Sequence, residues 1–222
     1  MNRFSLQGKC AVVTGGSRGI GAAIALGLAD AGADVLLTYR EKHAEAHAVA
    51  EQIKAKGRRA LAVQMDVTQR LQVESAAEQA RAFGPVQILV NNAGINKPTD
   101  FDAVTDADWD MIVDANLKGP FVVSQVFLPL LKAAGGGAIT HIGSVSGQYG
   151  GPRTAHYAAS KAGLISLAQV IARFGAQYNV RSNTVAAGLI ASEMAQAAGL
   201  PHDAHLAGGI KAWKAAGLPT ER

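Results

Sequence analysis

The sequence has little cysteine, little charge and no long apolar run. Cys10 is the only cysteine, which excludes an internal disulfide and offers no cysteine cluster with metal-ligand spacing. No apolar run reaches the roughly 18 residues that a membrane helix needs, and the first nine residues lack the apolar core of a signal peptide. We therefore expect a reduced, cytoplasmic protein with no metal site and no membrane partner.

Charge is sparse, and neither sign is concentrated. Charged residues make up 17% of the chain, the net charge is +4, and Lys and Arg are scattered, so nucleic acid is not an expected partner. Hydrophobic residues make up 49%, which suits central strands that are covered by helices on both faces. A chain of 222 residues is long enough for one large domain and too short for two full α/β domains.

Short apolar runs alternate with longer helical segments. Strands are expected over residues 10–14, 34–39, 60–64, 86–90, 137–142 and 180–185. The intervening segments read as helices, including one over about 106–132 that is interrupted near Lys118-Gly119-Pro120. Strands that are separated by helices form parallel βαβ units. The predicted fold is therefore α/β, a single domain with a doubly wound parallel sheet of the Rossmann type.

A glycine-rich turn follows the first expected strand. That strand ends at Thr14, and Gly15, Gly19 and Gly21 come before a helix of small residues. Glycines let the chain turn sharply and let its backbone approach a pyrophosphate, which the N–H groups of a helix N-terminus can bind. The spacing differs from the common G-x-G-x-x-G fingerprint, and a turn without a ligand is the alternative. We predict a dinucleotide site at this turn.

The end of the second strand indicates which nucleotide binds. An acidic residue there would favour NAD, whereas this chain has Arg40, and Arg18 lies inside the glycine turn. Two guanidinium groups suit the 2′-phosphate of NADPH. We therefore predict NADPH/NADP+ as the cofactor. The alternative is that both arginines are solvated, and Glu41 next to Arg40 argues for caution.

Two further strand ends open onto the same crevice. Asp66 follows the third strand and either accepts from the adenine amino group, with Val67 against the ring, or caps the next helix. Asn92, Ala93 and Gly94 follow the fourth strand, where an amide can line the crevice and also hold neighbouring strands together. We predict cofactor contacts at both segments.

The stretch from Ser144 to Lys161 contains the candidate catalytic groups. Tyr157 and Lys161 stand four residues apart at the start of an expected helix, so both side chains project from one face. A cation beside a phenol lowers the phenol pKa, which would let Tyr157 exchange a proton near neutral pH. Ser144 could hold a substrate oxygen in front of the tyrosine. On spacing alone, an ordinary exposed Tyr–Lys pair is the more frequent outcome.

Other polar residues nearby carry weaker predictions. His141 lies on an expected strand without a carboxylate partner, and His156 points off the catalytic face, so both are expected to be structural. Gln148, Tyr149 and Arg153, in the loop before Tyr157, fit substrate contact and plain exposure equally well.

Four motifs in order resemble the short-chain dehydrogenase/reductase family. They are T-G-G-S-R-G-I-G, N-N-A-G, a serine thirteen residues before a tyrosine, and Y-A-A-S-K. The resemblance covers about residues 5–194 and is strongest to bacterial 3-oxoacyl-acyl-carrier-protein and acetoacetyl-CoA reductases. It implies a small or carrier-bound ketone substrate and a homodimer or homotetramer.

The family's catalytic tetrad falls on four residues of this chain. The resemblance implies that Asn116 holds a water that links the lysine to solvent, and that Ser144 polarises the substrate carbonyl. It implies that Tyr157 is the general acid and that Lys161 binds the nicotinamide ribose and lowers the tyrosine pKa. Further cofactor contacts are implied at Ser17, Ile20, Gly188, Ile190 and Ser192.

The last part of the sequence departs from the family. Ala187 stands where relatives have a proline, and Ser192 where they have a threonine. From about Leu200 onward, the expected lid, helix and final strand are not recognisable. We predict a dinucleotide-binding reductase domain over 1–200 and an atypical tail over 201–222, whose sequence resembles the end of a rhodanese-like domain.

Loss of a seventh strand has a physical consequence. The sixth strand becomes a sheet edge with unpaired backbone groups. We expect a helix over about 209–216 to pack Trp213 against this edge.

The leading hypothesis is NADPH-dependent reduction of a ketone, foremost a 3-oxoacyl thioester, to the 3-hydroxy product. One alternative is an NAD-dependent alcohol or sugar dehydrogenase, which differs at the arginines of the nucleotide site. The other is a catalytically weak nucleotide-binding protein, a consequence of the altered C-terminal region.

Overall fold

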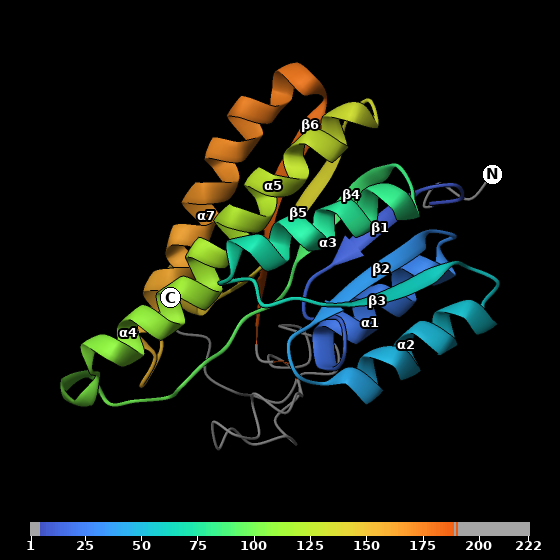
Figure 1. Ribbon diagram of the computed structural model, residues 1–222. Coiled ribbons are helices and arrows are strands. Elements are labelled where there is room, and N and C mark those ends of the chain that lie inside the picture. Colours follow the sequence, from blue (N-terminus) through green and yellow to red (C-terminus); the bar gives the residue numbers. More distant parts are fainter. Residues whose placement is uncertain (1–4, 189, 191–222) are drawn as a thin grey trace, which may run out of the picture. The chain divides into compact units, whose positions relative to one another are not determined.

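The computed structural model describes residues 5–188 and 190. Its centre is one sheet of six strands, all parallel, in the order β3-β2-β1-β4-β5-β6 (Figure 1). These strands belong to one compact unit, Met1–Gly188. The predicted doubly wound parallel sheet is confirmed.

The elements alternate along the chain as the sequence predicts. The strands are β1 (Cys10–Val13), β2 (Asp34–Tyr39), β3 (Ala60–Gln64), β4 (Val86–Asn91), β5 (Gly137–Ser144) and β6 (Val180–Ala187). The α-helices are α1 (Gly19–Asp30), α2 (His43–Ala55), α3 (Arg70–Phe83), α4 (Asp106–Val113), α5 (Gly119–Ala133), α6 (Ser146–Tyr149) and α7 (Ala155–Gly175). Shorter helical turns are η1 (Phe101–Ala103), η2 (Asp114–Lys118) and η3 (Ala176–Tyr178).

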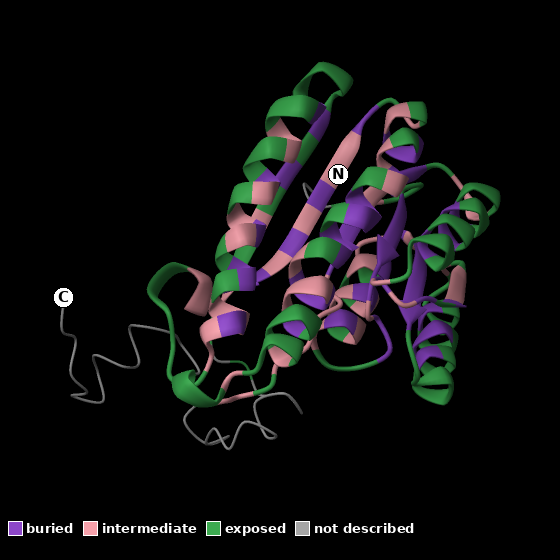
Figure 2. Ribbon diagram, turned by 60° about the vertical axis from the view of Figure 1, so that its left-hand side comes forward, coloured by how far each residue is buried: buried purple, intermediate pink, exposed green. Residues whose placement is uncertain are grey.

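The sheet is sandwiched between helices, which explains its continuous apolar strands. All four residues of β1 are buried, because it has a strand on each edge and helices over both faces. One core cluster joins α1 and α2 to the strands, and a second joins α3 and α5 to the opposite face. Helix residues alternate between buried and exposed along their length (Figure 2), as an amphipathic helix on a sheet requires.

A single helical run without a break joins α4, η2 and α5. The sequence predicted an interruption near Lys118-Gly119-Pro120. Instead, Asp114–Lys118 form a π-helical segment, and α5 continues directly from Gly119. Pro120, which has no backbone N–H to donate, follows directly after this π-helical segment, in which the N–H of Gly119 reaches back to the carbonyl of Asp114.

β6 is the edge of the sheet within residues 5–188. It pairs with β5 along its whole length, from Gly137↔Val180 to Ser144↔Ala187, and the Val185 side chain is half exposed. The predicted edge position of this strand is therefore present in the described part of the chain. The tail over 201–222, the helix over 209–216 and Trp213 lie outside the described residues.

The topology fixes where a ligand can bind. The strand order reverses between β1 and β4, and ligands of such sheets bind beyond the carboxyl ends of the strands at that point. Gly15 follows β1, Asn92 follows β4, and Ser144 ends β5, so all three segments lie at this rim. Within the described chain, none of the helices combines the length and the apolar character that crossing a bilayer requires.

Candidate active site

Two glycines shape the turn after β1 because other backbone lies directly against them. Gly15 has φ +65°, and an added Cβ would approach the Cα of Ala93 to 3.0 Å. A Cβ on Gly21 would overlap the carbonyl oxygen of Gly15. Neither position accepts a larger side chain without displacement of the turn.

Side chains from β1 and β4 hold this turn in place. The Thr14 hydroxyl accepts from the backbone N–H groups of Asn92 and Ala93, each at 3.0 Å. The Asn92 amide donates to the carbonyl oxygens of Thr14 and Gly15, also at 3.0 Å each. The predicted locking role of Asn92 is present in the structure, whereas the role of Thr14 was not predicted.

The start of α1 suits an anion. Its N-cap residue, Arg18, makes no side-chain cap hydrogen bond, and the first turn has no acidic residue. The first N–H groups of a helix lack helical acceptors and carry partial positive charge. Ser17 and Ile20 flank this start, and Gly19 makes the turn with φ +54°. A bare, tightly turned backbone next to free donors fits the pyrophosphate of a dinucleotide.

Basic side chains lie around the end of β2. Arg40 forms an ion pair with Glu41, Nη2 to Oε1 at 2.7 Å, and both side chains are more than half exposed. The pKa of Glu45 is lowered first by a backbone hydrogen bond, and also by the charges of Lys42 and Arg18. The charge of Arg18 is therefore felt at the start of α2, the helix that follows Arg40 in the chain.

At the end of β3, Asp66 closes a turn that leads to α3, but it does not cap this helix, whose N-cap residue is Gln69. The backbone N–H and the hydroxyl of Thr68 both donate to Asp66 Oδ1, at 2.9 and 2.8 Å. Val67 is buried in the core, and a Cβ on Gly119 would lie 2.8 Å from its Cγ2. An adenine contact at these two residues stays a prediction.

Ser144 and Tyr157 meet at the carboxyl end of β5. Ser144 Oγ accepts from the N–H of Ser146 at 3.1 Å, and the Ser144 hydroxyl is near enough to the Tyr157 phenol to affect its pKa. Burial raises the pKa of the Tyr157 phenol, and the Ser144 hydrogen bond opposes part of that rise. Tyr157 therefore keeps its proton at neutral pH and can donate it.

Lys161 is buried beside them. Its Nζ donates to the carbonyl oxygen of Ile142 at 2.8 Å and lies 5.6 Å from the centroid of the Tyr157 ring. Burial lowers the Lys161 pKa to about 8. The sequence predicted that this lysine lowers the tyrosine pKa, but in this structure the net shift of Tyr157 is upward. Burial of the phenol is the largest cause of this upward shift, and the Lys161 ammonium donates to a carbonyl of β5 rather than to the phenol.

Asn116 is positioned by the π-helical segment. Its Oδ1 accepts from the N–H of Ile95, and its Nδ2 donates to the carbonyl of Ile95, both at 2.8 Å. The second Nδ2 donor reaches Ser160 Oγ at 3.3 Å. Both hydrogens of the Asn116 amide are thereby bonded within the protein. The predicted water would therefore have to donate to an oxygen atom of Asn116.

Sequence reasoning missed the role of Ser160. This buried hydroxyl accepts from Asn116 and donates to the backbone carbonyl of Tyr157 at 2.7 Å. It therefore connects η2 to the first turn of α7. Its place within Y-A-A-S-K was the only available signal.

Gly94 marks the point where three segments meet. A Cβ there would lie 3.0 Å from Asn116 Oδ1 and 3.6 Å from Lys161 Nζ. The structure thus brings the loop after β4, the π-helical segment and the Tyr157 helix together. All four predicted tetrad residues lie in this one region.

His141 belongs to a buried polar row across the strands. The Asn91 amide contacts Ser124 Oγ at 2.9 Å and His141 Nδ1 at 3.3 Å, and Ser182 Oγ contacts His141 Nε2 at 3.3 Å. Burial, assisted by the charge of Lys161, lowers the His141 pKa to about 4. His141 is therefore a neutral structural residue, as the sequence indicated.

The remaining predicted residues are exposed or lie outside the described part of the chain. Gly188 follows β6 and is exposed, Ile190 is exposed, and Ser192 lies outside the described residues. Tyr149 is strongly exposed, and Arg153 forms an ion pair with Asp100 at 3.0 Å. Contacts of these residues with cofactor or substrate stay predictions.

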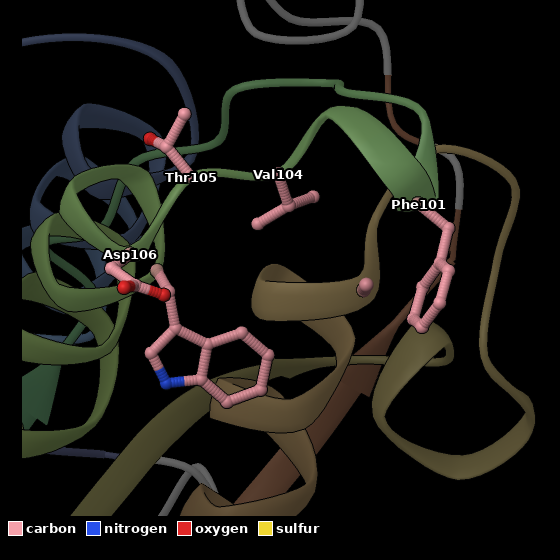
Figure 3. A pocket seen from close by; sticks show the side chains of 6 residues that line it. Phe101, Val104, Thr105 and Asp106 are labelled. Carbon is pink, nitrogen blue, oxygen red and sulfur yellow. The ribbon is translucent and has the colours of Figure 1, made fainter.

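A shallow pocket of about 240 Å³ lies near the start of α7 (Figure 3). The rings of Phe101 and Trp109 are among the side chains that line it. Ala155 also lines it, two residues before Tyr157. An apolar group next to the candidate catalytic residues would find aromatic contacts here.

The chain is similar in sequence to known reductases. The short chain dehydrogenase family profile matches residues 9–202. A 3-oxoacyl-acyl-carrier-protein reductase of Staphylococcus epidermidis is 42% identical over 190 residues, which is 85% of this chain and 78% of that protein. The reductase of the same description from Synechocystis sp. is 37% identical over 193 residues, 86% of this chain and 78% of that protein.

The fold is similar to a solved structure as well. A gluconate 5-dehydrogenase from Burkholderia cenocepacia, in complex with NADP and tartrate, superposes with a TM-score of 0.83 and is 35% identical. The match covers 88% of this chain and 76% of that one.

Proposed function

Because the chain belongs to the short-chain dehydrogenase family of oxidoreductases, we propose that it reduces a 3-oxoacyl thioester to the 3-hydroxy product with NADPH. The observation that carries this proposal is the Ser144–Tyr157–Lys161 group, assembled at the strand rim next to the glycine turn. The 42% identity to a reductase of 3-oxoacyl thioesters supports the substrate class.

Each catalytic side chain is suited to a defined task. When bound, the nicotinamide supplies the hydride. Ser144 holds the substrate carbonyl oxygen, and Tyr157, whose phenol is protonated at neutral pH, gives a proton to that oxygen as negative charge develops on it. Lys161 is protonated at neutral pH, and its charge favours the phenolate that remains after proton transfer.

The preference for NADPH rests on charge near β2. Arg40 follows β2, and the charge of Arg18 reaches Glu45 in the first turn of α2; guanidinium groups bind phosphate in two-point geometry. In this proposal Arg40 exchanges its Glu41 partner for the 2′-phosphate. NADPH contacts at Gly15, Ser17, Gly21, Asn92 and Gly94 follow from the shape of the turn.

The test is NADPH oxidation with acetoacetyl-CoA and a panel of small ketones, run in parallel with NADH, together with a thermal-shift titration by each nucleotide. We expect turnover and a preference for NADPH of at least about tenfold, a difference of roughly 1.4 kcal/mol. A preference below that value would contradict the arginine clamp. Nucleotide binding without turnover on any carbonyl would favour the nucleotide-binding alternative. The homodimer or homotetramer and the cytoplasmic location stay predictions.

A further inference from the structure

His156 contacts the backbone of the candidate proton donor. Its ring is fully buried, and its Nδ1 accepts from the backbone N–H of Tyr157 at 3.0 Å. The sequence indicated only that the His156 side chain points off the catalytic face. The structure shows that this ring meets the main chain of the next residue.

This bond replaces a missing helix cap. α7 begins after Thr154, whose side chain makes no cap hydrogen bond and donates instead to the carbonyl of Gly151 at 2.9 Å. The helical ladder starts only at Ala158, whose N–H reaches the carbonyl of Thr154. The Tyr157 N–H is therefore one of the first-turn donors without a helical acceptor, and the imidazole supplies that acceptor.

The contact also fixes the state of the ring. A nitrogen that accepts a hydrogen bond carries no proton, so the proton of neutral His156 is on Nε2. Nε2 is buried and has no hydrogen-bond partner among the residues that the structure describes. A buried donor without a partner is unfavourable, so this arrangement is retained at a cost to stability.

We propose that His156 is a positioning residue for the reaction: through its Nδ1 it holds the first turn of α7 and thereby the Tyr157 hydroxyl in front of the substrate carbonyl. Ser160 holds the same turn from the other side, through the Tyr157 carbonyl. With both main-chain groups of Tyr157 bound, the backbone from which the phenol projects is fixed. A displacement of about 1 Å at a reacting group can reduce a rate by about a hundredfold.

The part of this proposal that concerns catalysis rests on the proposed function. The hydrogen bond itself can be tested without substrate or nucleotide. Failure of the reductase assignment and failure of the positioning role are therefore distinguishable.

The experiment compares three substitutions of one residue. His156→Asn keeps an acceptor at the position of Nδ1, whereas His156→Gln keeps a polar group only at the position of Nε2, and His156→Leu has neither. The first measurement is the amide hydrogen exchange rate of the Tyr157 N–H in the nucleotide-free protein. We expect protection to remain in wild type and Asn, and exchange at least tenfold faster in Gln and Leu.

The second measurement is steady-state ketone reduction by the same variants. We expect Gln and Leu to lower kcat about tenfold with KM for NADPH within twofold, and Asn to recover most of the loss. His141→Leu, at the other buried histidine, is the matched control. It should lower the melting temperature and leave both the Tyr157 exchange rate and kcat within twofold.

Three results would overturn the proposal. Unchanged Tyr157 exchange in the Leu variant would show that the hydrogen bond does not hold the turn. Equal loss of kcat in Asn, Gln and Leu would indicate packing alone. A loss of kcat in His141→Leu as large as in His156→Leu would show that the effect is general destabilisation.

Discussion

The two ends of the site differ in whether backbone or side chains form them. The end at β1 and β2 is made by backbone: glycines that leave no space for a Cβ, and a helix start without a side-chain cap. The end at β5 and α7 is made by side chains that burial has made chemically unusual, with the Tyr157 pKa raised and the Lys161 pKa lowered. The first end is therefore defined by the shape of its backbone, and the second by buried titratable side chains.

This difference determines how each end fails. A substitution at the backbone end should impair binding and folding together, because the turn is part of the sheet rim. At the side-chain end, one functional group can be removed while the fold and the nucleotide site remain.

The largest expected effect is at the side-chain end. Tyr157→Phe removes the hydroxyl that donates the proton and keeps the ring. We expect ketone reduction to fall by about 10²–10⁴-fold, the usual contribution of a general acid. NADPH affinity, measured by thermal shift or fluorescence titration, should stay within about threefold of wild type.

Two outcomes would contradict this prediction for Tyr157→Phe. An undiminished rate in Tyr157→Phe would remove the proton-donor assignment. Loss of NADPH binding along with activity would show that the two ends are not separable.

Gly21→Ala tests the backbone end. The added Cβ would overlap the Gly15 carbonyl, so the turn must shift or the helix must move. We expect destabilisation by about 1–3 kcal/mol, as for other overpacked sites, together with loss of NADPH binding, measured by denaturant unfolding and titration. Gly27→Ala in the same helix is the control, because nothing lies within 4 Å of its Cβ position. It should stabilise the protein by up to about 1 kcal/mol.

The smallest effect is a pH dependence of stability that arises from Lys161. Its pKa is about 8 in the folded protein, below its ordinary value of 10.5. Above pH 8 the unfolded chain therefore binds more protons at this residue than the folded one, so its contribution to stability rises with pH and the full penalty applies below pH 8. We expect a slope of at most about 1.4 kcal/mol per pH unit between pH 8 and 9.

The measurement is the difference between wild type and Lys161→Met in urea unfolding at pH 7, 8 and 9, without nucleotide. Burial raises the pKa of Cys10 to about 11 and also raises that of Tyr157. These groups contribute with the opposite sign at higher pH. Cys10 is unaffected by Lys161 and cancels in the difference, and Tyr157, whose ordinary pKa is 10.0, contributes little up to pH 9. Parallel stability profiles would mean that Lys161 is not desolvated.

The same contrast explains what the sequence could predict. Gly15, Gly21 and Asn92 are recognisable because a tight turn needs them at fixed spacing within one short stretch or at a strand end. The Tyr157–Lys161 spacing was equally visible. The direction of the tyrosine pKa was not, because it depends on burial by segments far away in the chain.

The missed residues share a cause. Ser160 and His156 contact the backbone of Tyr157, and Asn116, which was predicted, has an unpredicted partner in Ile95, twenty-one residues earlier. Such contacts depend on how α4, η2 and α7 pack, which no local pattern encodes. The π-helical geometry of Asp114–Lys118 was likewise predicted only as an interruption near its last residue, Lys118.

The π-helical segment Asp114–Lys118 makes the number of residues between α4 and α5 important. Each residue of an α-helix turns the chain by about 100°, so removal of one residue from Asp114–Lys118 would restore ordinary winding and swing the Asn116 amide away from Ile95. The run would still be helical and still cover the sheet. A chain with one residue fewer could therefore fold normally and still lose the Asn116 contacts near Lys161. The number of residues in this segment is thus as important as their identity.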